Sequence, residues 1–158
     1  MCEYWNAAQG RWVLVDAQLD DVWQRELKFD FNPLDVPRTQ FLVAADAWTR
    51  CRTGRLDPAK VGIFAGNLRG LWFIAAELVR DLAALNAVEM LPWDCWGIIP
   101  KPGTTLSDSQ LAFFDRLAAL TATPDGSFDE LRAMYDRHDE LRVPPQIFNA
   151  LLNRMETV

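Results

Sequence analysis

Few residues of this chain have the chemistry of a nucleophile, a base or a metal ligand, and they are widely spaced. The sequence holds three cysteines, Cys2, Cys51 and Cys95, and one histidine, His138. An odd number of cysteines without metal-ligand spacing predicts neither a disulfide framework nor a structural zinc site. We read Cys51 and Cys95 as small apolar residues and expect His138 to be exposed in its charged segment. No metal and no cofactor is expected.

Carboxylates at three places are candidates for acid–base work. Asp16 ends a β-rich run, where its side chain either orients a histidine or accepts a hydrogen bond from the main chain of Gln18. Asp20 and Asp21 are expected in a solvated turn, because no further carboxylate clusters near them. Asp81 falls on the apolar side of the longest expected helix, where an unpaired carboxylate is costly. We expect a buried or interfacial hydrogen-bond network there, with a functional site as the alternative.

A short hairpin must position the N-terminal candidates. Residues 2–5 and 11–16 are β-rich, and residues 6–10 between them have turn composition with a glycine. A two-stranded hairpin alone is marginally stable in water, so we infer the last two strands of a larger sheet. Trp5 and Trp12 lie on this hairpin and are candidate binding residues.

Beyond the hairpin, apolar residues recur at helical spacing. Helices are expected over residues 38–53 and 70–86, from Ser107, from Ser127, and over residues 146–155. Ser107 with Gln110 and Ser127 with Glu130 have the spacing of capping boxes, and Asp57-Pro58 that of a short turn. The prediction is an α+β chain, predominantly helical, with an N-terminal two-stranded antiparallel hairpin and about five helices. Residues 1–35 and 36–158 are expected to form together one compact unit.

Three tryptophans further along the chain are Trp72, Trp93 and Trp96. In so apolar a setting we expect them in the core, with hydrogen-bonded indole N–H groups. The alternative is that they line a binding cleft. Trp93 is therefore kept as a candidate binding residue.

Composition excludes several classes of protein. Half of the residues are hydrophobic, 24% are charged and the net charge is −6, which indicates a globular chain and argues against a nucleic-acid partner. The basic patch Arg50, Arg52, Arg55 and Lys60 is too small to reverse that argument. Charges interrupt every apolar run before the ~18 residues of a membrane span, and no leader is recognisable. We expect a soluble, reduced, cytoplasmic protein without membrane contact.

The N-terminal residues resemble a known family. Glu3-Tyr4-Trp5, then Gly10 and Trp12-Val13-Leu14-Val15-Asp16, resemble the end of the transglutaminase-like domain, a papain-like cysteine fold. In that family a strand carries the catalytic His, and an Asp on the next strand orients it. The resemblance implies that Asp16 is this orienter. Residues 16–97 also resemble the C-terminal extension of a bacterial subgroup of transglutaminase-like proteins.

The departure from the family matters for function. By the motif's spacing the His would lie about two positions before Met1, and the nucleophilic Cys further upstream. Cys2 and His138 do not occupy the positions of these residues. The resemblance thus implies a truncated, catalytically incomplete fragment of a Cys-His-Asp acyl-transfer enzyme, an amide hydrolase or amine transferase.

Two alternatives stay open. In the first, the chain is a non-enzymatic interaction module or pseudoenzyme that pairs through the exposed edge of the Cys2–Asp16 hairpin. Both the fragment hypothesis and the interaction-module hypothesis predict self-association or a partner chain at that edge. In the second, an unrelated enzyme uses Asp81, Glu77 and Glu89, which no motif supports.

Overall fold

The computed structural model describes residues 2–63 and 67–158. The chain divides into two compact units, Met1–Leu42 and Val43–Val158. The boundary thus lies at 42/43, whereas the sequence placed it at 35/36. That both parts form a single compact unit stays a prediction, and each is described by itself below.

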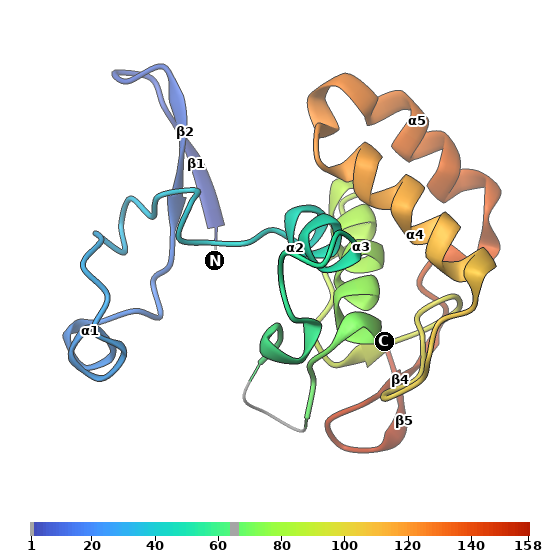
Figure 1. Cartoon of the computed structure of the whole chain (residues 1–158). Coiled ribbons are helices and arrows are strands. Elements are labelled where there is room, and N and C mark those ends of the chain that lie inside the picture. Colours follow the sequence, from blue (N-terminus) through green and yellow to red (C-terminus); the bar gives the residue numbers. More distant parts are fainter. Residues whose placement is uncertain (1, 64–66) are drawn as a thin grey trace. The chain divides into compact units, whose positions relative to one another are not determined.

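The N-terminal unit contains the expected hairpin. Strands β1 (Cys2–Asn6) and β2 (Arg11–Val15) pair antiparallel, with Cys2 opposite Val15 and Asn6 opposite Arg11 (Figure 1). Asparagine, alanine and glycine supply the turn, and Gly10 has a positive φ of 59° there. The prediction of an antiparallel hairpin is confirmed.

Helix α1 (Asp21–Leu27) follows the hairpin and was not expected from the sequence. The Asp20 side chain accepts hydrogen bonds from the main-chain N–H groups of Val22 and Trp23, at 2.9 and 3.0 Å. Asp20 is therefore a helix N-cap rather than part of a solvated turn. None of the residues of α1 is buried.

The C-terminal unit is built around one central helix, α3 (Leu71–Leu85). Helix α3 contacts α2 (Ala44–Arg52), α4 (Asp108–Thr121), α5 (Pro124–Arg137) and the short helix η1 (Pro58–Lys60) (Figure 1). Its residues are apolar on most sides, and ten of them are buried. A second short helix, η2 (Asp139–Leu141), follows α5.

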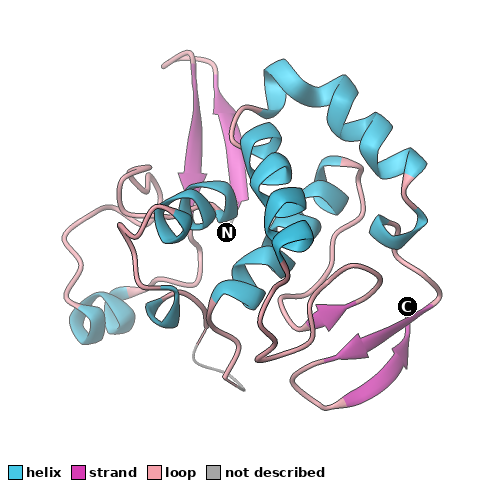
Figure 2. Cartoon of the chain, turned by 45° about the vertical axis from the view of Figure 1, so that its right-hand side comes forward, coloured by secondary structure: helices cyan, strands magenta, loops and turns pink. Residues whose placement is uncertain are grey.

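A three-stranded antiparallel sheet closes the C-terminal unit (Figure 2). It consists of β3 (Asp94–Cys95), β4 (Gln146–Asn149) and β5 (Arg154–Thr157). The helix predicted over residues 146–155 is therefore wrong. The Asn149 side chain accepts the N–H groups of Leu151 and Leu152, at 3.0 and 2.9 Å, and this turn joins two strands instead.

Two of the predicted helix starts differ from those in the structure. The helix expected over 38–53 begins at Ala44, and the Ser107–Gln110 capping box is present as predicted. The box expected at Ser127 is wrong, because α5 begins earlier, with Pro124 in its first turn. Asp57 accepts the N–H of Ala59 at 3.0 Å, as its pairing with Pro58 predicted.

The two units differ sharply in their cores. In the C-terminal unit Trp48 packs against Phe114, with ring centroids 5.5 Å apart, and Ile74, Leu78 and Leu82 are fully buried. The described part of the N-terminal unit buries just Val13, Leu14 and Val36. The predicted class, α+β with an N-terminal hairpin and a helix-rich remainder, is confirmed. Among the described residues, no helix has the length and apolar character needed to cross a bilayer.

Candidate functional site

The hairpin presents a pair of tryptophans on one face. Trp5 lies opposite Trp12, and their rings meet edge to face with centroids 5.7 Å apart. Their exposed fractions are 52% and 54%. The two candidate binding residues of the hairpin thus form one half-exposed aromatic surface.

The outer edge of β2 is partly covered by a later segment of the same unit. The Val36 N–H donates to the Leu14 carbonyl at 2.8 Å, and the Asp16 N–H donates to the Pro33 carbonyl at 2.9 Å. Ion pairs of Arg11 with Asp35 and of Arg38 with Glu3 hold this segment to both strands. We call residues 33–38 the edge cover.

The outer edge of β1 has no comparable cover within the described part of the N-terminal unit. The N–H and C=O groups of successive residues point to opposite sides of a strand. Since Leu14 and Asp16 direct these groups away from β1, Val13 and Val15 direct theirs toward β1 and form the hydrogen bonds of the hairpin. The N–H and C=O groups of Tyr4 and Cys2, which lie opposite Val13 and Val15, then point toward β2. The N–H and C=O groups of Glu3 and Trp5 therefore point outward, and we call them the free edge.

Asp16 lies partly buried at the end of β2. Its Oδ1 accepts the N–H of Gln18 at 3.1 Å, and its carbonyl accepts the N–H of Leu19 at 3.2 Å. The main-chain role considered for Asp16 is thus present in the structure. Its Oδ2 makes no hydrogen bond within the described residues, so one oxygen is available to a further donor.

Helix α1 adds apolar surface that the sequence analysis missed. Val22, Trp23 and Leu27 are each about half exposed, at 53%, 50% and 52%. The signal in the sequence was Asp20, a favourable N-cap two positions before the apolar residues Val22 and Trp23. The N-terminal unit therefore exposes aromatic side chains on its hairpin, and aromatic and aliphatic side chains on α1.

A second cluster lies on α3 in the C-terminal unit, centred on Arg80. This buried guanidinium donates from Nε and Nη2 to the Asp94 carbonyl, at 3.2 and 2.8 Å, and from Nη1 to Glu77 at 2.8 Å. It also lies over the Phe73 ring, 5.9 Å from its centroid. Arg80 joins α3 to strand β3, which the sequence analysis did not foresee.

Asp81 lies beside this cluster without entering it. Burial raises the pKa of Asp81 to about 7, the negative charge of Glu77 adds to the rise, and Arg80 opposes it. Burial likewise raises the pKa of Glu77, against the effect of Arg80. Arg80, and not Asp81, forms the hydrogen-bond network that was expected at this place. Within the described residues the Asp81 carboxylate makes no hydrogen bond.

Glu89, the third residue of the unrelated-enzyme alternative, lies elsewhere. It lines a surface hollow of about 440 Å³ with Asp94, Ile147 and Glu156. The charge of Glu89 is not among those that shift the pKa of Asp81. The structure thus brings Glu77 and Asp81 together and leaves Glu89 out.

The tryptophans of the C-terminal unit lie in or against the core. Trp93 is partly buried and packs on the cluster of Leu68, Trp72 and Phe73. The Trp96 indole donates to the Leu141 carbonyl at 3.0 Å, as a buried indole requires.

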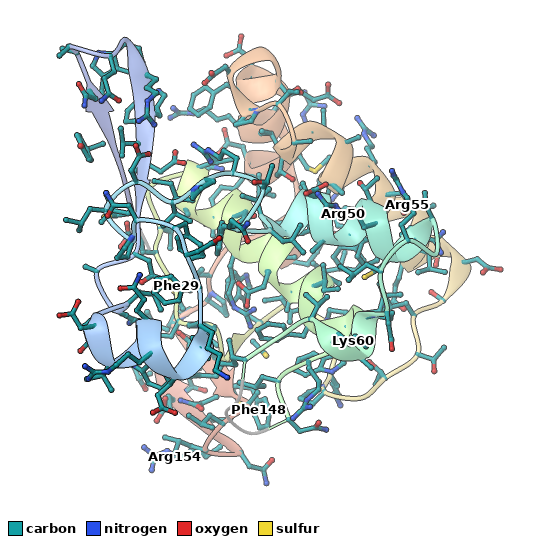
Figure 3. All side chains as sticks on the ribbon, turned by 60° about the vertical axis from the view of Figure 1, so that its left-hand side comes forward. Phe29, Arg50, Arg55, Lys60, Phe148 and Arg154 are labelled. Carbon is teal, nitrogen blue, oxygen red and sulfur yellow. The ribbon has the colours of Figure 1, made fainter. Side chains whose placement is uncertain are left out.

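The thiols and the basic patch do not build a reactive centre. Burial raises the pKa of both Cys51 and Cys95, which keeps them protonated thiols. Arg50 lies on α2, Arg55 follows that helix, and Lys60 lies on η1 (Figure 3). The charge of Arg50 is compensated by an ion pair with Asp46 at 2.7 Å. In the two described ranges no group of three or more His, Cys, Asp or Glu side chains could hold a metal ion.

Comparisons of this chain with protein-family models, with curated proteins and with solved structures give no match. The resemblance to the transglutaminase-like family therefore stays a prediction.

Proposed function

We propose that the N-terminal unit is a strand-pairing module, in which an extended segment of a second polypeptide adds to β1 as a further strand. The observation that carries this proposal is the free edge of Glu3 and Trp5 beside a β2 edge that is covered at Leu14 and Asp16. Main-chain hydrogen bonds supply affinity in this mode of recognition, and alternate side chains supply specificity.

The energetics of the unit favour an added strand. A two-stranded sheet is marginal in water, and three or more strands with an apolar face are needed for independent stability. This unit buries Val13, Leu14 and Val36 among its described residues, while Trp5 and Trp12 stay half exposed. A third strand on β1 would pair the free edge and extend the aromatic face.

The test selects short random peptides, displayed on phage, for binding to the immobilised chain. Peptides that pair with β1 should be lost with Glu3→Pro, which removes an edge N–H, and kept with Glu3→Gln, which removes the carboxylate alone. Peptides that bind all three proteins equally would show that the free edge does not recognise strands.

A second candidate function rests on Asp16. In the antiparallel register of β1 and β2, a residue two positions N-terminal to position 1 shares the face of Asp16 as its diagonal neighbour. Asp16 Oδ2 has no hydrogen bond within the described residues, so it could receive the Nδ1–H of an imidazole at that place. As the resemblance implies, Asp16 would then hold the base of a Cys-His-Asp acyl-transfer site in the reducing cytoplasm.

Both proposed functions require a second polypeptide beside the hairpin. Acyl-transfer activity distinguishes between them. A fragment of a transglutaminase-like domain that carries the Cys and His but ends before the hairpin is mixed with this chain. Incorporation of a fluorescent amine into a glutamine-containing protein should appear in the mixture and vanish with Asp16→Ala. Absence of activity in a mixture that does form a complex would leave pairing without catalysis.

A further inference from the structure

We infer that the strand accepted by β1 is β1 of a second copy of this chain, so that two hairpins form one four-stranded sheet around a two-fold axis at Tyr4. This inference rests on the proposed strand-pairing function and names its partner. It also states a register, which can be tested residue by residue.

The free edge is complementary to itself. Glu3 and Trp5 point their main-chain groups outward and are separated by one residue. When two β1 strands run antiparallel with Glu3 opposite Trp5 of the second copy, each such pair exchanges N–H···O=C bonds in both directions. Every outward group of Glu3 and Trp5 in both copies is then paired.

The side chains favour this register over its neighbours. Tyr4 lies opposite Tyr4 of the second copy, in a pair without main-chain bonds, where side chains approach most closely and aromatic pairs are favourable. A shift of the register that places Glu3 opposite Glu3 moves Trp5 past the start of β1 of the second copy, which begins at Cys2, so the edge groups of Trp5 stay unpaired. A shift that places Trp5 opposite Trp5 leaves the edge groups of Glu3 unpaired.

Charge does not prevent the approach of two copies. Although the net charge of the chain is −6, Glu3 is already paired with Arg38 of the edge cover in its own unit. On β2, Arg11 is likewise paired with Asp35. The strands that meet therefore carry compensated charges, as a symmetric interface requires.

The edge cover explains why such an assembly would close as a dimer. Antiparallel sheets with two open edges can add chains without limit. Here the outer edge of β2 is covered at Leu14 and Asp16. Pairing through β1 alone uses the same edge on both copies, which generates a closed two-fold assembly.

Sedimentation at micromolar concentration tests the inference first. The wild-type chain and Glu3→Gln should sediment as dimers, and Glu3→Pro should raise the dissociation constant by ~10-fold or more. Proline is tolerated at position 3 because the N–H of Glu3 does not bond to β2. A circular dichroism signal from the Trp5–Trp12 pair reports that the hairpin of each variant is intact.

Disulfide trapping tests the register. In a Cys2→Ser background, Tyr4→Cys should form an intermolecular disulfide on mild oxidation, since opposed residues of a pair without main-chain bonds lie about 4.5 Å apart between Cα atoms. Asn6→Cys should not, because two strand positions separate it from the axis. Trapping of Asn6→Cys but not of Tyr4→Cys would overturn the register.

A monomeric wild-type chain would overturn the inference of a second copy. If displayed peptides still depend on the N–H of Glu3 in that case, the strand-pairing function survives with a different partner. If neither dimer formation nor peptide binding depends on the N–H of Glu3, both proposals fail.

Discussion

The indole rings of Trp5 and Trp12 meet edge to face across the β1–β2 pair, with an angle of 68° between their planes. They occupy directly opposite positions of the antiparallel register. The unit has few buried residues, and this edge-to-face pair adds an aromatic contact between its two strands. Through this contact β1, the strand with the free edge, packs against β2, the strand whose outer edge is covered.

Removing either ring should weaken the hairpin measurably. We expect Trp12→Val to destabilise the N-terminal unit by about 0.5–1.5 kcal/mol beyond the loss of apolar area, because the aromatic pair is lost while a good strand former stays. Thermal unfolding followed by circular dichroism measures this. Trp5→Val should have little additional effect once Trp12 is gone, and Trp23→Ala on α1 should leave the Trp5–Trp12 signal intact.

Arg80 should be among the most sensitive positions of the C-terminal unit. Arg80→Met leaves Glu77 and the Asp94 carbonyl without their donor, and we expect a loss of about 3–5 kcal/mol in the free energy of unfolding. Arg116→Met is the matched control, since its pair with Glu130 is exposed and should contribute about 0–1 kcal/mol. Equal losses in urea unfolding would contradict the anchoring role of Arg80.

Asp81 should make stability depend on pH around neutrality. Its pKa of about 7 in the folded chain lies above the ordinary value of 3.8, so the contribution of the protonated carboxyl is complete below pH 3.8 and lost as the pH rises through 7. Asp81→Asn, uncharged throughout, should therefore match the wild type in acid and exceed it above pH 7, by on the order of 1–4 kcal/mol.

Unfolding at a series of pH values measures this difference. A constant difference between Asp81→Asn and the wild type would mean that the carboxyl does not titrate in this range.

Gly97 should tolerate no side chain. Its φ is +47°, and an added Cβ would collide with the main-chain carbonyl of Glu140. Gly103 also has a positive φ, of +75°, but an added Cβ there meets nothing. We expect Gly103→Ala to cost about 1 kcal/mol of stability and Gly97→Ala about 1–3 kcal/mol more. Similar melting temperatures of the two variants would argue against the close approach.

The sequence by itself determined the elements whose signals lie within a few residues. Two β-rich runs and a turn with a glycine predicted the hairpin, and Ser107 with Gln110 predicted the start of α4. Apolar residues on most sides of residues 70–86 predicted the central helix α3. These features need no distant partner, which is why they could be predicted.

Tertiary structure decided the features that depend on hydrogen bonds between distant residues. Val36 on Leu14 covers one edge of the hairpin, and Arg80 on the Asp94 carbonyl joins α3 to β3. The pairing of β4 with β3 and β5 likewise turned an expected helix into two strands. No short window of sequence contains both partners of such contacts, because the fold itself brings them together.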